Sequence, residues 1–397
     1  MADTDVDRRL SQIVFVVFSD DWGRHPSSCQ HLFRRITPHA QVLWVNTVGL
    51  RVPRFSVHDI RRGLQVLISW LGPARAAGGP AAPGHSSQAE APEVLRPVMW
   101  PSFRRRWLAA LNQRLLSRAV TSALGKTAAG KQAILVSTLP IVPRLFRDKR
   151  FVKTVYYCVD DFTEWHGIDG DAMRRMETET VAACDLLIAT STPILESRGP
   201  LSRRSVLLTH GVDAALFANA TPDPASALAA LPHPIVGLFG VFDQRIDAEA
   251  LIAAARALPA ATFAVVGPVV DRDPGEFRDV PNLRFFGAVP YSELPGQVAH
   301  FDVCILPYVL DDTTRSINPL KLKEYLATGK PVVATPLPEA VKLGEYLILA
   351  APDRFAQEVA RAAATPPPRS PNLPGFLTGE SWEGKAARFV EEILQDL

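Results

Sequence analysis

A lysine and a glutamate three residues apart form the pair best suited to chemistry in this sequence: Lys321 and Glu324, in the segment SINPLKLKEYLATGKPVVATPLPE at residues 316–339. Asn318 and Pro319 precede them and predict a helix start, because Asn is a preferred N-cap and Pro is tolerated at the first helical position. The amide hydrogens and positive dipole of that start favour a diphosphate, to which the lysine adds a cation. The glutamate could then accept both hydroxyls of a ribose. The segment therefore predicts a nucleotide-diphosphate pocket.

The rest of the segment predicts how this helix ends. It is expected to run through Ala327 and to stop at Gly329, because glycine readily adopts the backbone conformation that closes a helix. Residues 332–334 are apolar and predict a central parallel strand. The alternative is an ordinary amphipathic helix packed on a sheet, in which the lysine and the glutamate contact only solvent.

A second cation follows the apolar residues 235–239, which predict the first strand of a second domain. Gly240 lets the backbone approach a ligand, and Arg245 is expected to clamp a phosphate at the carboxyl end of this strand. The alternative is that Arg245 pairs with Asp243 or Asp247 on the surface, where such a pair contributes little.

Three carboxylates follow the predicted strand at residues 154–159. Asp160, Asp161 and Glu164 would lie at the carboxyl edge of a parallel sheet, where ligands of α/β proteins bind. Adjacent aromatic side chains could raise the proton affinity of one carboxylate, which could then act as a general base toward an acceptor hydroxyl. The alternative is that Asp160 or Asp161 caps the following turn. No third ligand accompanies the pair, so no metal is expected.

The loop after the first predicted strand, SDDWGRHPSS, is a further candidate. Gly23 could allow backbone contact with donor phosphates, and Ser27 or Ser28 could cap a helix that presents Gln30 and His31 to an acceptor. The alternative for His31 is a buried structural histidine. Neither first strand is followed by GxGxxG, which argues against a dinucleotide cofactor and hydride chemistry.

Short apolar segments alternate with helical patterns along most of the chain, which is typical of a doubly wound parallel sheet. The predicted strands are 13–18, 42–45, 133–137, 154–159, 186–189 and 206–208, then 235–239, 262–266, 283–286, 303–306 and 332–334. The gap between the two groups predicts two Rossmann-like domains.

These patterns give a domain organisation for the 397 residues. We expect an N-terminal acceptor domain at 1–217, a linker at 218–234 and a nucleotide-sugar-binding domain at 235–375. Residues 376–397 are expected to form a helix that crosses back to the first domain. Residues 72–93 are rich in Gly, Pro, Ala and Ser and predict a flexible loop.

Charge is distributed unevenly, because residues 51–150 hold seventeen Lys and Arg and four acids in a chain of net charge +2. Within them, residues 96–118 interleave arginines with Trp100, Phe103 and Trp107 and predict a basic amphipathic helix that docks on an anionic membrane. The alternative is a core-packed helix with solvated arginines, and nucleic acid is not expected as a partner. No apolar run is long enough for a signal peptide or a bilayer span. The four cysteines occur singly, as expected of free thiols in a reducing cytoplasm, so with this helix we expect a cytoplasmic protein that is peripheral on the inner membrane face.

Several segments together resemble GT-B glycosyltransferases close to family 4, group 1. Besides 316–339 they are LLTHGVDAALF at 207–217, FDQRID at 242–247, PNLRFFGAVPYSELP at 281–295 and FDVCILPY at 301–308, in family order. The closest likeness is to the teichuronic-acid and exopolysaccharide subgroup. The resemblance implies an α/β GT-B fold with two Rossmann-like domains and an interdomain cleft.

The resemblance also implies roles for residues at the donor site. Glu324 matches the second family glutamate, which binds the donor ribose, whereas the first family glutamate falls on Ser316. Backbone around Ala288 would read a uracil or guanine ring. Arg245, Lys321 and the backbone at Asn318, Pro319 and Leu320 would stabilise the departing diphosphate.

The function expected from this resemblance is transfer of a sugar from a UDP or GDP donor to a glycan or lipid-linked acceptor in cell-surface polysaccharide biosynthesis. The reaction would retain the anomeric configuration and need no metal or other cofactor, and Asp160 or Asp161 would orient the acceptor. Two alternatives are a nucleotide-sugar epimerase and a noncatalytic GT-B-like scaffold subunit, the latter motivated by Ser316.

Overall fold

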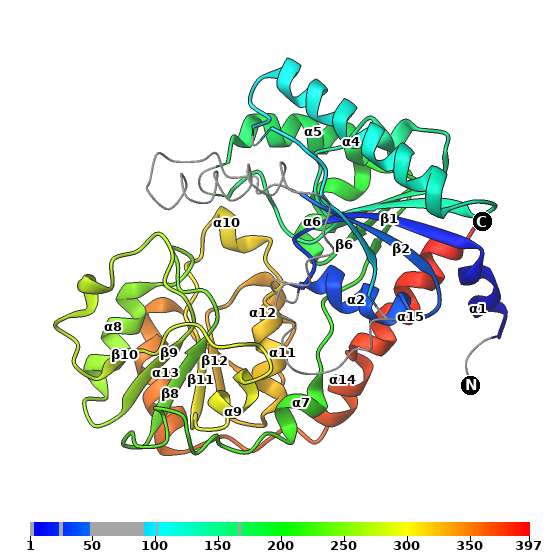
Figure 1. Cartoon of the computed structure of the whole chain (residues 1–397). Coiled ribbons are helices and arrows are strands. Elements are labelled where there is room, and N and C mark those ends of the chain that lie inside the picture. The colour runs from blue at the N-terminus through cyan, green and yellow to red at the C-terminus, as the bar shows by residue number, and fades with distance from the viewer. Residues whose placement is uncertain (1–3, 24–26, 48–90, 101, 166–167) are drawn as a thin grey trace. The chain divides into compact units, whose positions relative to one another are not determined.

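The computed structural model describes residues 4–23, 27–47, 91–100, 102–165 and 168–397 (Figure 1). Most of the predicted loop at 72–93 lies outside these residues.

The chain divides into two compact units, each built around its own parallel sheet. The first comprises Met1–Thr190, Ile194–Leu208 and Ala386–Leu397, and the second Ser191–Pro193 and Thr209–Lys385. The predicted linker at 218–234 lies within the second unit, which begins upstream of it.

Over the described residues, the sheet of the first unit has seven parallel strands in the order β3-β2-β1-β4-β5-β6-β7. Its central strands are buried on both faces, which is why they consist of continuous apolar runs. The strands are β1 (Ile13–Ser19), β2 (Gln41–Asn46), β3 (Glu93–Leu95), β4 (Gln132–Ser137), β5 (Phe151–Cys158), β6 (Leu186–Ala189) and β7 (Ser205–Leu207). The order reverses between β1 and β4, which is the point where doubly wound sheets bind ligands.

Helices lie between successive strands of the first unit in the described residues. They are α2 (Ser28–Ile36), α4 (Arg106–Thr127), α5 (Gly170–Ala183) and α6 (Thr192–Arg198), with the short turns η2 (Leu145–Arg147) and η3 (Gly199–Leu201). Helix α1 (Thr4–Ser11) precedes β1.

The predicted helix at 96–118 is wrong at its start, because α4 begins only at Arg106. The buried amide of Asn112 explains why the described residues just before α4 are not helical. Its Oδ1 accepts from the backbone N of Trp100 at 2.7 Å, and its Nδ2 donates to the carbonyls of Trp100 and Ser102. These bonds replace helical ones, so the segment is stable without being helical.

The second unit contains six parallel strands in the order β10-β9-β8-β11-β12-β13. They are β8 (Ile235–Phe239), β9 (Thr262–Val266), β10 (Leu283–Phe285), β11 (Val303–Leu306), β12 (Val332–Ala334) and β13 (Ile348–Leu349). Its helices are α7 (Ala214–Ala218), α8 (Ala248–Ala257), α9 (Leu294–Val298), α10 (Asp312–Arg315), α11 (Leu320–Ala327), α12 (Pro338–Val341), α13 (Pro352–Ala364) and α14 (Leu373–Gly379), with the turn η4 (Pro274–Phe277). The predicted α/β class with two doubly wound parallel sheets is confirmed.

The last helix, α15 (Trp382–Leu394), begins in the second unit and continues into the first from Ala386. Its Phe389 is fully buried and meets Phe33 and Tyr157 edge to face, with ring centroids 5.9 and 5.5 Å away. These contacts make the end of the helix part of the first unit's core.

Candidate functional site

The site lies in the second unit, where β8 and β11 end and α11 begins. Gly240 follows β8 with φ of +102°, and a Cβ there would lie 2.6 Å from Cε and 2.8 Å from Nζ of Lys321. Only glycine combines this backbone conformation with such close approach. Gly240 and Lys321, far apart in sequence, are therefore packed against each other.

The ammonium group of Lys321 is the central feature of the site. Its Nζ is buried and has no hydrogen-bond partner in the described part of the chain. It lies 5.5 Å from the ring centroid of Tyr308, which follows β11. A buried ammonium with unused donors is costly unless a ligand supplies acceptors, so this arrangement fits an anionic ligand.

Arg245 adopts the alternative weighed from the sequence, because it pairs with Asp243. Its Nε donates to Oδ1 at 2.9 Å and its Nη2 to Oδ2 at 2.8 Å, a bidentate geometry. Burial would raise the pKa of Asp243, but the hydrogen bonds and charge of Arg245 lower it below its usual value. Arg245 also lies 5.9 Å from the ring of Tyr308, so both predicted cations meet at one tyrosine.

Helix α11 starts one residue later than predicted. Pro319, not Asn318, is the N-cap, and no side chain caps the helix. Proline has no amide hydrogen and here takes an extended conformation, so the first turn begins at Leu320. The predicted end at Ala327 is confirmed. The first-turn amide hydrogens next to Lys321 thus receive no side-chain cap.

Ser316, where the resemblance places the first family glutamate, is buried. Three buried side-chain polar atoms have no hydrogen-bond partner among the described residues, namely Ser316 Oγ, Thr180 Oγ1 and Lys321 Nζ. The carbonyl of Ser316 accepts a 2.6 Å hydrogen bond from Ser191 Oγ. Two of these three atoms therefore belong to the loop and helix start predicted to hold the donor.

Glu324 lies on α11 with 7% of its surface exposed. The hydroxyl of Tyr291 donates to its Oε1 at 2.8 Å. Burial raises the pKa of Glu324 from 4.5 to about 7, while the Tyr291 hydrogen bond and the charge of Lys321 act in the opposite direction. This carboxyl is thus balanced between its two protonation states near neutral pH.

Buried contacts fasten α11 in place. The backbone N of Phe239 donates to the hydroxyl of Tyr325 at 2.8 Å, which ties the helix to β8. Lys323 binds the carboxylate of Glu380, and Lys385 binds its other oxygen at 2.8 Å. Burial lowers the pKa of Lys323 to about 8, although Glu380 opposes the shift.

The loop after β10 contains the predicted base-reading residue. Ala288 is exposed there, and the preceding Gly287 has φ of +72° with open space around it. The positive φ turns the backbone at the carboxyl end of this strand.

The predicted residues of the loop after β1 form a network of their own. Gly23 has φ of +80°, and its backbone N donates to Oε1 of Gln30 at 3.0 Å. The amide of Gln30 donates to Asp20. Burial lowers the pKa of His31 to about 3, so this histidine is neutral. Gln30 shapes the loop and His31 is packed in the unit, and their role toward an acceptor stays a prediction.

The predicted carboxylates after β5 are mostly engaged. Asp161 Oδ1 accepts from the backbone N and hydroxyl of Thr163, the turn-capping alternative, and its Oδ2 meets Arg198 at 2.5 Å. Asp160 Oδ1 accepts the backbone N of Asp161 at 2.8 Å. Glu164 lies 3.6 Å from Arg174. Asp161 is therefore held by a cap and an ion pair, and a base role for Asp160 stays a prediction.

Sequence reasoning missed several partners of these side chains, namely Tyr291, Tyr308, Ser191 and Arg198. Tyr291 lies in the segment 281–295, and its position shortly after β10 was the only sequence signal that it could reach the site. The described residues include no group of three His, Cys, Asp or Glu side chains that could hold a metal ion. None of the helices described is long and apolar enough to cross a membrane.

Comparison with known proteins extends these findings. Residues 233–365 match the family described as Glycosyl transferases group 1. A protein of Bacillus subtilis (strain 168) that carries the name teichuronic acid biosynthesis glycosyltransferase TuaH is 33% identical over 138 residues. The match covers 34% of this chain and 35% of that protein, about a third of its length. The predicted resemblance to group 1 glycosyltransferases is confirmed over the matched residues.

Solved structures share the fold across nearly the whole chain. A sucrose-phosphate synthase of Thermosynechococcus elongatus is 17% identical, with a TM-score of 0.69. The match covers 96% of this chain and 98% of the synthase chain. Anabaena HepE, solved with UDP and glucose, is 16% identical, with a TM-score of 0.62. The match covers 98% of this chain and 100% of the HepE chain. At these identities the likeness concerns the fold, and it confirms the predicted GT-B class.

Proposed function

We propose that this protein is a glycosyltransferase, in which residues 233–365 form a group 1 glycosyl transferase domain. It moves a sugar from a nucleotide-diphosphate donor to a glycan or lipid-linked acceptor in cell-surface polysaccharide biosynthesis. The observation that carries the proposal is the buried ammonium of Lys321, which lacks a hydrogen-bond partner among the described residues and packs against Gly240. UDP is the proposed nucleotide, since HepE was solved with UDP-glucose and an Escherichia coli protein of this fold with UDP-2-fluoro glucose.

The proposed mechanism is electrostatic. Lys321 and the uncapped amides of α11 hold the diphosphate and stabilise the negative charge that grows on it as the glycosidic bond breaks. Arg245 contributes through its position beside Tyr308, although Asp243 shares its charge. Glu324 accepts the ribose hydroxyls once its proton has left. Because two cations serve the leaving group, we propose that transfer needs no metal, and that it retains the anomeric configuration.

We also propose that the protein docks on an anionic membrane from the cytoplasmic side, through the segment that contains α4. Trp100 and Trp107 are 58% and 61% exposed, and the arginines between them are exposed as well. Exposed tryptophans flanked by arginines suit the boundary between headgroups and acyl chains.

Donor binding tests the enzymatic proposal. Calorimetry with UDP-glucose should show binding by the wild type, and Lys321→Met should weaken it about tenfold or more, because a charge-assisted hydrogen bond is lost. Lys342→Met removes the same charge from an exposed lysine of the same unit and should bind like wild type. Equal affinities for all three proteins would remove the diphosphate role of Lys321.

Nucleotide release distinguishes the competing functions. A panel of sugar nucleotides is incubated with candidate acceptors, and free nucleotide is measured. Release that requires an acceptor supports transfer, interconversion of sugar nucleotides without an acceptor supports an epimerase, and donor binding without turnover supports the scaffold alternative favoured by Ser316.

A further inference from the structure

We propose that a pocket beside α4 binds the phosphate of an anionic phospholipid and thereby gives the protein a specific headgroup site. The proposal rests on the membrane association proposed above. It replaces a diffuse attraction between charges with a binding site built from two elements of the first unit.

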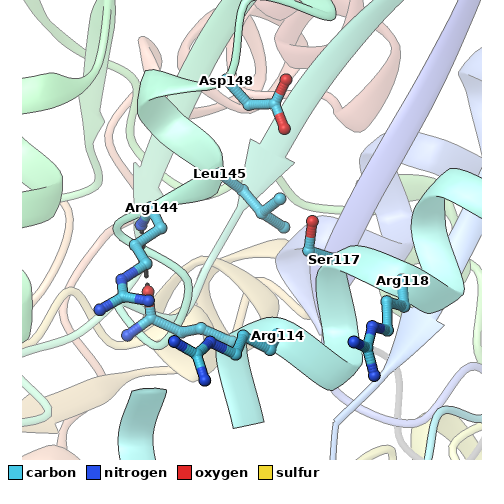
Figure 2. A pocket seen from close by; sticks show the side chains of 7 residues that line it. Arg114, Ser117, Arg118, Arg144, Leu145 and Asp148 are labelled. Carbon is cyan, nitrogen blue, oxygen red and sulfur yellow. Dashed lines mark hydrogen bonds between the residues drawn. The ribbon is translucent and has the colours of Figure 1, made fainter. Parts of the chain in front are cut away.

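The pocket has a volume of about 310 Å³ and lies between α4 and the turn η2 (Figure 2). In Figure 2 the guanidinium groups of Arg114 and Arg144 lie toward one end and Asp148 at the other. Arg114, Arg118 and Arg144 line the pocket together with Asp148.

The charge of this pocket is not neutralised by its single carboxylate. Asp148 is engaged by Arg150, whose Nε lies 3.0 Å from each of its oxygens, and these hydrogen bonds lower the pKa of Asp148. Across the described ranges, no carboxylate forms a salt bridge with Arg114, Arg118 or Arg144. Three guanidinium groups thus remain for an anion, and their planar forks match phosphate oxygens.

The same helix joins this cationic pocket to an apolar surface. Trp107, Leu111, Arg114 and Arg118 follow one another at spacings of four, three and four residues, so they share one exposed face of α4. Trp107 is 61% exposed and Leu111 40% exposed. The opposite face packs into the core through Ala109, Leu116, Val120 and Ala123.

Trp100, which precedes α4, is a further exposed aromatic side chain, with 58% of its surface accessible. Its neighbours Met99 and Phe103 are buried, and its own backbone is bound on both sides by the buried amide of Asn112. A free phosphate ion would make no favourable contact with these apolar side chains, whereas a phospholipid presents a phosphate next to acyl chains. This complementarity selects the phospholipid as the occupant.

Paired arginine variants test the pocket against diffuse attraction. Arg144 lines the pocket, and Arg147 is an exposed arginine of the same turn that does not. Binding to phosphatidylcholine vesicles containing phosphatidylglycerol is measured by co-sedimentation at fixed ionic strength. Arg147→Gln should weaken binding about fivefold, the effect of one surface charge. Arg144→Gln should weaken it about fiftyfold, because a direct charge-assisted hydrogen bond is lost as well.

The remaining arms separate the possible failures. Equal losses for the two variants would overturn the pocket and leave diffuse docking. Calorimetric binding of inorganic phosphate that Arg144→Gln abolishes, with vesicle binding unchanged, would assign the pocket to a soluble anion and overturn the lipid. Absence of vesicle binding by the wild type would overturn both the membrane docking and the pocket. Its binding of UDP-glucose would still test the enzymatic proposal independently.

Discussion

Donor affinity is expected to rise with pH through neutrality, because Glu324 must lose a proton before it can accept two ribose hydroxyls. Burial places the pKa of this carboxyl at about 7 in the ligand-free protein. If only the ionised form binds, the apparent Kd is multiplied by the ratio of total to ionised protein. With a pKa of 7 that ratio is about 11 at pH 6 and about 1.1 at pH 8, so affinity should change about tenfold, or about 1.4 kcal/mol.

Calorimetry with UDP-glucose measures this directly, because its diphosphate does not titrate in this range. Titrations at pH 6, 7 and 8 give the affinity, and two buffers of different ionisation enthalpy at pH 7 give the protons released. Glu324→Gln should bind more weakly at every pH and without the pH dependence. Glu339→Gln changes another buried glutamate of the same unit and should keep it. Tyr291→Phe removes a hydrogen bond that lowers the pKa of Glu324, so the midpoint should move to higher pH.

Stability provides the complementary measurement. A carboxyl whose pKa is raised on folding contributes fully to stability below its unfolded pKa of 4.5, and the contribution is lost as pH rises through about 7. The size of the rise corresponds to about 3 kcal/mol. Glu324→Gln should therefore gain up to that amount over wild type at pH 8 and little at pH 4. A wild-type affinity that is flat with pH, or an equal slope in Glu324→Gln, would refute the ribose role.

Three further outcomes follow from the structure. Gly240→Ala should weaken UDP-glucose binding about tenfold or more in calorimetry, because the added Cβ displaces the Lys321 side chain and strains a positive φ; unchanged binding would contradict the packing described. Glu380→Gln should lower the free energy of unfolding by about 3 kcal/mol or more in urea, since it leaves two buried lysines without their carboxylate, while Lys323→Met should cost less because the second lysine still pairs with Glu380. His31→Gln should reduce the loss of stability between pH 6.5 and 3, because the pKa of His31 falls to about 3 on folding and the unfolded chain binds the extra proton there; identical acid unfolding curves would refute a neutral buried histidine.

The strands were largely predictable because their apolar runs are long and bounded by glycine, proline or polar residues. Five predicted strands coincide with the structure, at 186–189, 235–239, 262–266, 303–306 and 332–334. The edge strands β3 and β13 were missed because three and two residues show no period. The start of α4 was placed too early because the sequence pattern cannot reveal the bonds that Asn112 makes with Trp100.

The candidate site was predictable only as a set of residue types. Local spacing identified Lys321 and Glu324, since a loop, a helix and a strand follow one another around them. It could not show that Arg245 is shared with Asp243, that Tyr291 reaches Glu324 from 33 residues away, or that Arg198 occupies Asp161. Pairings of this kind depend on which strand ends lie next to each other in the sheet, and short-range sequence patterns do not show which ends are neighbours.

The buried position of Phe389 has a consequence for biosynthesis. Residues 386–397 complete the hydrophobic interior of the first unit, yet the ribosome adds them after all of 209–385. The side chains of Phe33 and Tyr157 therefore lack their Phe389 contact while the whole second unit is translated. During that interval the nascent chain would expose these aromatic side chains to chaperones, and their burial could begin only after residues 386–397 had been added.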